Sequence, residues 1–99
     1  NPQSYFEGCY GVNHEDCNPV PIKIKVYGSQ VDYVRARPIH ASQEEVEQGD
    51  GWSVFSYWLR PSYNFYQMLL WHREKVEVME PKEVRGEMKK IVNQISKQY

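Results

Sequence analysis

This sequence has few cysteines, no long apolar segment and almost no net charge, and each of these absences excludes a class of protein. Cys9 and Cys17 are its only cysteines, too few for a disulfide framework, so we expect a protein of the reducing cytoplasm. No apolar run approaches the roughly 20 residues of a membrane span and no signal-peptide pattern is visible, so we expect no membrane partner. A net charge of -1 argues against a domain that grips a nucleic-acid backbone unaided.

Motifs for catalysis or metal binding are also missing. A catalytic triad at His40 and Ser42 would need a nucleophile on a strained turn beside a paired base, and no serine here has that setting. Four N-terminal residues are conceivable metal ligands: Cys9, His14, Asp16 and Cys17. The cysteines do not form a C-x-x-C pair, however, so two reduced cysteines in a loop-rich arm are the favoured interpretation. We therefore predict no enzymatic activity, no catalytic residue, no cofactor and no tightly bound metal.

Aromatic residues, by contrast, are abundant, with eight Tyr, three Trp and three Phe in 99 residues. Tyr and Trp combine a large contact area with a polar group, so the surplus suggests interfaces as well as a core. Residues 1–19 are rich in Gly, Asn, Pro and aromatics, which predicts a linker or N-terminal arm ahead of a single domain at 20–99. Because the chain begins at Asn1 rather than Met, we expect a piece of a longer protein.

The first half of the domain has a strand, a short helix and a strand pair. Apolar and polar residues alternate from Ile22 to Tyr27, which predicts a strand with one buried face. Ser29 is a candidate N-cap for a helix that turns Val31 and Val34 inward and ends before Pro38. The pattern is extended over 39–48, turns at 48–51, and continues as a second strand over 52–60.

The second half predicts a helix, a strand and a closing helix. Ser62 is the expected N-cap of the first helix, whose inner stripe consists of Phe65, Met68, Leu69 and His72. A strand over 75–80 ends at Pro81, which suits the first position of a helix. The apolar residues of that last helix recur at the spacing of one face: Val84, Met88, Ile91, Ile95 and Tyr99.

The order β-α-β-β-α-β-α predicts an α+β fold, a ferredoxin-like βαββαβ sandwich with an additional C-terminal helix. Its sheet would have four antiparallel strands with two helices on one face. The strand over 52–60 is apolar on both sides, so one aromatic set would lie on the open face. Which set does so depends on the register, and the candidate interface or ligand residues are therefore Lys23, Lys25, Tyr57 and Trp58.

Two short motifs carry a family resemblance. Residues 38–43 have the sequence Pro-Ile-His-Ala-Ser-Gln, and residues 76–81 have Val-Glu-Val-Met-Glu-Pro. Further matches in the same order are Tyr5-Phe6, Gly11-Val12, Leu69-Leu70 and the final Tyr99. Together they resemble the C-terminal extension, called WCX, of bacterial WYL-domain transcriptional regulators. In one departure, the family commonly has Gly after the second helix, where this chain offers Arg73, so we expect that turn to be built differently.

The resemblance implies a longer regulator, with a winged-helix DNA-binding domain and a central WYL domain upstream of this segment. In that family the extension is associated with dimerisation and with modulating the regulator. The expected function is thus a non-enzymatic regulatory and dimerisation module. Its partners would be the WYL and helix-turn-helix domains of the same polypeptide, a second copy, and DNA through the missing N-terminal domain. The alternative is a small-ligand or single-stranded nucleic-acid binding domain that uses the open sheet face, since basic and aromatic residues together can stack bases.

Overall fold

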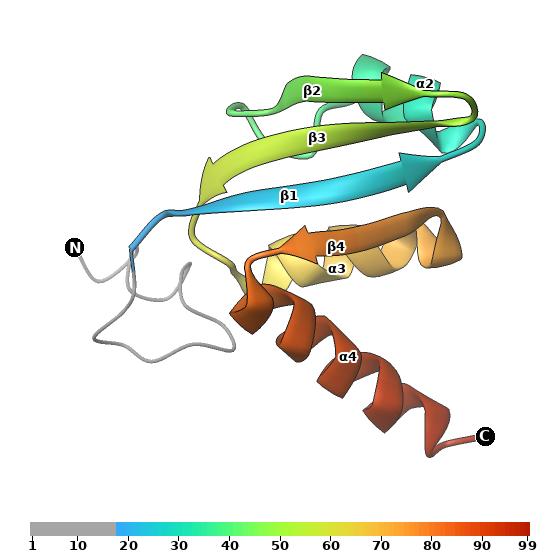
Figure 1. The fold of residues 1–99 in the computed structure, drawn as a ribbon. Coiled ribbons are helices and arrows are strands. Elements are labelled where there is room, and N and C mark those ends of the chain that lie inside the picture. The colour runs from blue at the N-terminus through green and yellow to red at the C-terminus, as the bar shows by residue number, and fades with distance from the viewer. Residues whose placement is uncertain (1–17) are drawn as a thin grey trace.

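The computed structural model describes residues 18–99, in which an open antiparallel sheet is backed by helices (Figure 1). The elements in chain order are β1 (Val20–Tyr27), α2 (Gln30–Ala36), β2 (Glu44–Gly49), β3 (Trp52–Leu59), α3 (Tyr63–Trp71), the 3-10 turn η2 (Arg73–Lys75), β4 (Val76–Glu80) and α4 (Lys82–Ser96). The strands are arranged in the order β2-β3-β1-β4, and all three neighbouring pairs are antiparallel. The α+β class predicted from the sequence is confirmed.

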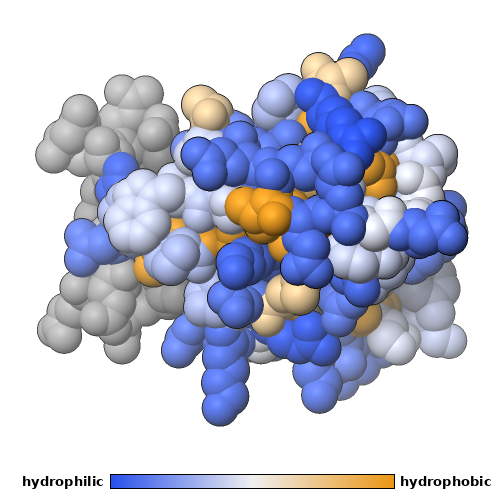
Figure 2. All heavy atoms as spheres, turned by 45° about the horizontal axis from the view of Figure 1, so that its top comes forward, coloured by the Kyte–Doolittle hydropathy of each residue, from blue (hydrophilic) through white to orange (hydrophobic). Residues whose placement is uncertain are grey.

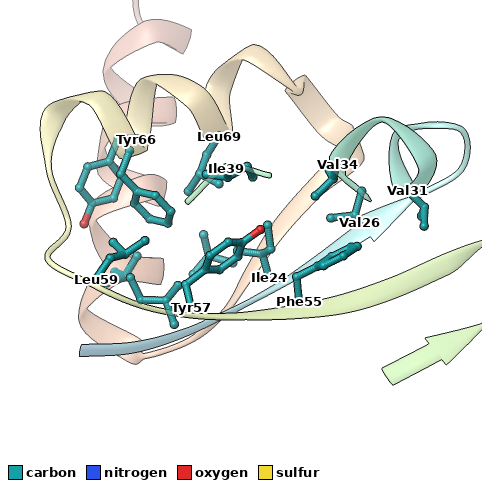
Figure 3. Close-up of a cluster of buried hydrophobic side chains, with 14 residues drawn as sticks. Ile24, Val26, Val31, Val34, Ile39, Phe55, Tyr57, Leu59, Tyr66 and Leu69 are labelled. Atoms are coloured by element: carbon teal, nitrogen blue, oxygen red, sulfur yellow. The ribbon is translucent and has the colours of Figure 1, made fainter. Parts of the chain in front are cut away.

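The core lies between the sheet and helices α2 and α3, which cover the same face (Figures 1 and 3). The β1 residues Ile22, Ile24 and Val26 are completely buried there. Their polar neighbours in sequence, among them the exposed Lys23, point to the other face because side chains alternate along a strand. The predicted one-sided burial of this strand is therefore confirmed.

Strand β3 contributes its second apolar set to the same core. Phe55, Tyr57 and Leu59 are buried beneath the helices, and Figure 3 shows their side chains among those of the helices. The register pairs Ile24 of β1 with Phe55, which places both on the helix-covered face. Trp52, Val54 and Trp58 consequently belong to the opposite face, which settles the choice that the sequence left open.

The two predicted N-caps differ in outcome. The Ser62 side chain accepts a hydrogen bond from the Phe65 backbone N–H at 3.2 Å, so this cap is confirmed. Ser29 does occupy the N-cap position of α2, as predicted, but its side chain makes no capping hydrogen bond. The reason is conformational: Ser29 has helical dihedral angles of φ -66° and ψ -17°, whereas a capping side chain needs an extended backbone to reach the following N–H groups.

The connection from α2 to β2 is not extended as predicted, since it bends and turns until β2 begins at Glu44. Gln43 replaces the missing strand pairing with side-chain hydrogen bonds. Its Oε1 accepts from the Ile39 backbone N–H at 3.1 Å and from the Tyr57 hydroxyl, and its Nε2 donates to the Val34 carbonyl at 3.0 Å. One amide side chain therefore satisfies groups of α2, the connection and β3.

The turn after α3 also departs from expectation. We expected it to be built without the left-handed backbone that glycine favours, yet Arg73 has φ 59°. A left-handed conformation costs a residue with a Cβ roughly 1–2 kcal/mol. The Arg73 side chain lies in solvent, where its Nε is 3.5 Å from Glu74 Oε1. The backbone strain is therefore offset by packing elsewhere in the domain and not by contacts of the Arg73 side chain.

Helix α4 packs on the domain through its first half only. Val84 is buried, and Met88 and Ile91 are half-buried against the core. Ile95, which the helical spacing places on the same face, is 43% exposed, and Tyr99 is fully exposed. Figure 1 shows the reason: the helix starts beside β4 and runs obliquely away from the sheet. Its apolar face therefore extends beyond the surface on which it packs.

Candidate interaction surfaces

We call the sheet side that α2 and α3 leave uncovered the open face. Its central residues come from β1 and β3 and are placed by the strand register. Lys25 of β1 lies opposite Val54 of β3, and Lys23 lies opposite Ser56. Trp58, two residues after Ser56, is therefore the diagonal neighbour of Lys23 on this face. Trp58 is 58% exposed, so it is available for contact with a partner.

Three of the four residues proposed from the sequence share the open face: Lys23, Lys25 and Trp58. Tyr57 does not join them, because it is only 3% exposed and lies in the core. Its hydroxyl is bonded to Gln43, and burial raises its pKa well above the usual range. Tyr57 is thus a core residue, and its inclusion among the surface candidates is corrected.

The electrostatics of the open face are balanced. Lys25 Nζ lies 4.4 Å from the centre of the Trp52 ring and 5.4 Å from that of Tyr27, in cation–π geometry. On its other side Lys25 is paired across the strands with Glu77. Lys23 is likewise opposite Glu80. Each lysine of β1 therefore has a carboxylate on the neighbouring strand, and no uncompensated basic track runs along this pair of strands.

Glu77 is the centre of a small network at the β4 edge. It accepts from the Tyr27 hydroxyl at 2.8 Å and from Arg85 Nη1 at 3.1 Å. The hydrogen bond from Tyr27, and then that from Arg85, lower the pKa of Glu77. Arg85 also donates to the Val78 carbonyl at 2.7 Å. The first turn of α4 is thereby fastened to strand β4.

Trp52 is less available than its position on the open face suggests. A methyl group added to Gly49 would lie 2.1 Å from a Trp52 ring carbon, so the ring covers the glycine backbone of β2. With Lys25 also at the ring, Trp52 is already packed.

Figure 2 shows separate hydrophobic patches among predominantly hydrophilic side chains on the surface turned forward from Figure 1.

A second surface is formed by the end of α4, which stops at Ser96, and by the residues after it; we call it the α4 distal stripe: Val92, Ile95 and Tyr99. Val92 is 48% exposed, and the other two are exposed as described above. The stripe continues the line of Met88 and Ile91 beyond the domain surface. It also borders a groove of about 270 Å³ between α4 and β4, whose apolar lining includes Val76, Val78 and Met88.

The sequence model of the WCX domain matches residues 18–96 of this chain. The chain belongs to the WCX domain family. No curated protein matches it. WCX domains are associated with WYL-type regulators, so the chain fits a regulatory module.

Three residues of the 38–43 motif that carried the resemblance have structural roles in this WCX domain: His40, Ser42 and Gln43. The Ser42 Oγ accepts from the Trp58 backbone N–H at 2.9 Å and bonds to His40 Nδ1 at 2.8 Å. The Ser42 N–H also donates to His40 Nδ1 at 3.1 Å. Together with Gln43, these bonds fasten the α2–β2 connection to β3. The sequence analysis named Gln43 as part of the motif but did not predict this structural role.

An aromatic column lies on the helix layer of the WCX domain. The rings of Tyr33 and Trp71 stack at 5.2 Å, and Arg37 lies 5.3 Å from the Tyr33 ring. His72 meets both rings edge-on and accepts from Gln30 at 2.8 Å. Burial lowers the pKa of His72. No sequence signal predicts this column, because it depends on how α2 and α3 pass one another.

Other classes of site can be addressed only for residues 18–99. No helix there is long and apolar enough to cross a membrane. Within the same part of the chain, no group of three or more His, Cys, Asp or Glu side chains is placed to hold a metal ion. The four conceivable ligands named from the sequence, Cys9, His14, Asp16 and Cys17, lie outside the described residues.

Proposed function

We propose that this WCX domain is the non-enzymatic regulatory and dimerisation module of a bacterial WYL-type transcriptional regulator. The observation that carries the proposal is the α4 distal stripe, an exposed apolar surface at the C-terminal end of α4 and just beyond it. A soluble monomer gains nothing from such a face, and a contiguous one usually marks a partner surface. We assign it to a second copy of the same domain.

The expected strength of this contact suits regulation. Burying the exposed parts of Val92, Ile95 and Tyr99 in two copies would contribute on the order of 5 kcal/mol before the entropy of association is subtracted. Alone, that gives a weak dimer. Joined to contacts of the upstream domains it gives a dimer that a modest coupling energy, about 1–3 kcal/mol in regulated proteins, can shift. DNA would be bound by the helix-turn-helix domain of the same polypeptide, in the cytoplasm.

We also assign the domain, taken as residues 20–99, to the ferredoxin-like class. The strand order β2-β3-β1-β4 and the placement of α2 and α3 on one face support this assignment. Helix α4 is the addition to that plan. The two core helices leave one sheet face open, so that face and the added helix offer surfaces to a partner, and Trp58 and the α4 distal stripe lie on them.

The alternative function, binding of a small ligand or single-stranded nucleic acid on the open face, has one observation in its favour. Trp58 is exposed beside Lys23, and an aromatic ring next to a cation can stack a base. The carboxylates opposite Lys23 and Lys25 favour dimerisation over this alternative. Single-stranded DNA binding that falls in both Lys23→Ala and Lys25→Ala, with dimerisation intact in Ile95→Asp, would replace our proposal with the alternative.

Sedimentation velocity of the 99-residue chain over a range of concentrations tests the proposed dimer. We expect reversible association that Ile95→Asp weakens at least about tenfold, since a charge is placed in the middle of the apolar contact. Gln94→Asp is the matched control, because it introduces the same charge one residue away and off the stripe. Equal association of both variants and the parent chain would contradict the proposal.

A further inference from the structure

A cleft of about 340 Å³ lies where the α2–β2 connection meets the start of α3, and we call it the α3 cleft. One part of its wall is apolar and consists of Ile39, Leu59, Phe65 and Met68. The first three of these are core residues. Leu59 is on β3, Phe65 is on α3, and Ile39 in the α2–β2 connection is fastened through its backbone N–H to Gln43, so the apolar wall is preformed. Its volume is at the lower end of the range of small-molecule sites.

The other part of the wall is polar and comes from two separate segments: His40 from the α2–β2 connection, and Arg60, Ser62 and Asn64 from the start of α3. Arg60 is half-buried. None of the ion pairs among residues 18–99 includes Arg60. Among the residues that the structure describes, no Asp or Glu lines the cleft, and within this lining Arg60 supplies a positive charge without a carboxylate beside it.

The remaining polar groups are mostly donors. His40 Nδ1 already accepts a hydrogen bond from the Ser42 backbone N–H and contacts the Ser42 hydroxyl. In the neutral ring the proton is therefore on Nε2, the nitrogen left to donate. Ser62 Oγ accepts from the Phe65 N–H, which leaves its hydroxyl hydrogen to donate. The Asn64 amide adds two further N–H groups.

From this arrangement we propose that the α3 cleft binds a small organic anion, a carboxylate or phosphate ester attached to a compact apolar body. The anionic group pairs with the Arg60 guanidinium, whose planar fork of N–H donors matches both acids. The apolar body rests against Leu59 and Phe65. Because the described part of the lining has several donors, the Arg60 cation and no carboxylate, it favours an anionic ligand over a cationic one.

Nuclear magnetic resonance titration of the ¹⁵N-labelled 99-residue chain tests the proposal. The probes are phenyl phosphate and benzoate, which separate the two acids, and benzyl alcohol as a neutral ligand of similar shape. For a ligand of this size we expect a dissociation constant of about 1 mM. The amide signals of Arg60 and Phe65 should move with at least one of the anions and not with benzyl alcohol.

Two variants identify the cleft as the site. Arg60→Gln should weaken binding of the responding anion at least about fivefold, because the guanidinium that pairs with it is lost. Asn64→Asp should weaken it similarly through charge repulsion, while an acid in the first turn of α3 favours the helix and preserves the fold. The matched control Gln67→Glu adds the same charge to α3 outside the cleft and should leave binding unchanged.

Three outcomes would overturn the inference. The first is that neither anion moves these signals, the second is that benzyl alcohol moves them equally, and the third is that Asn64→Asp binds the anion as tightly as the parent chain. Dimerisation measured on the same variants keeps this inference separate from the proposed function. A cleft that fails to bind leaves the α4 contact unaffected, and loss of the dimer in Ile95→Asp leaves anion binding unaffected.

Discussion

Replacing Gln43 by Ala should destabilise the domain far more than its half-exposed position suggests. The substitution removes the acceptor of the Tyr57 hydroxyl and of the Ile39 N–H, and the donor to the Val34 carbonyl. Leaving a buried polar group unpaired costs about 1–3 kcal/mol. Tyr57 is deeply buried, whereas water can reach part of the Gln43 site, so we expect a total loss of about 3 kcal/mol.

Urea unfolding followed by tryptophan fluorescence measures this loss, with Gln67→Ala on the exposed side of α3 as the control. A double-mutant cycle makes the test specific. In a Tyr57→Phe background no buried hydroxyl is left without a partner. Gln43→Ala should therefore lower the free energy of unfolding by about 1 kcal/mol less than it does in the parent chain. Additivity of the two substitutions within about 0.3 kcal/mol would show that the Gln43–Tyr57 bond contributes nothing, and the reasoning would fail.

Three further results are expected. Arg73→Gly should raise the free energy of unfolding by about 0.5–1 kcal/mol in the same assay, because relief of the left-handed strain exceeds the added freedom of the unfolded chain; an unchanged or lower stability would contradict the observed backbone. Hydrogen bonds from Arg35 and then Ser53 lower the pKa of Glu45 to about 2 from 4.5, so its contribution is complete above pH 4.5 and is lost as the pH falls towards 2. Unfolding curves across that range should converge for the parent chain and Glu45→Gln, and a constant gap would refute the linkage. Gly49→Ala should displace the Trp52 ring and change its fluorescence, whereas Gly86→Ala, at a position with open space, should not.

The sequence predicted those parts of the fold that depend on local pattern. The alternation of Ile22, Ile24 and Val26 identified the buried side of β1, and Ser62 identified the start of α3. Ser29 was placed correctly at the N-cap, but the capping bond did not form, because a capping residue is recognised by its type while its backbone conformation is set by the turn that precedes it. Arg73 was misjudged for a related reason, since glycine is preferred in that conformation but is not required.

The surfaces were less predictable, because they depend on where the tertiary structure ends. Helical periodicity places Val84 and Ile95 on the same face equally well. Only the oblique departure of α4 from the sheet makes one buried and the other exposed. The register of β3 likewise decided between Tyr57 and Trp58, and hydrophobicity that is high on both faces of a strand carries no information about that choice.

The most direct test of the account joins association to regulation in the full-length protein. Subunit association, by sedimentation, and operator DNA binding should be measured together for the parent regulator, Ile95→Asp and Gln94→Asp. We predict that Ile95→Asp weakens the dimer and operator binding by the same factor, while Gln94→Asp changes neither. A regulator that carries Ile95→Asp and still dimerises and binds its operator like the parent protein would show that the α4 distal stripe is not the subunit contact.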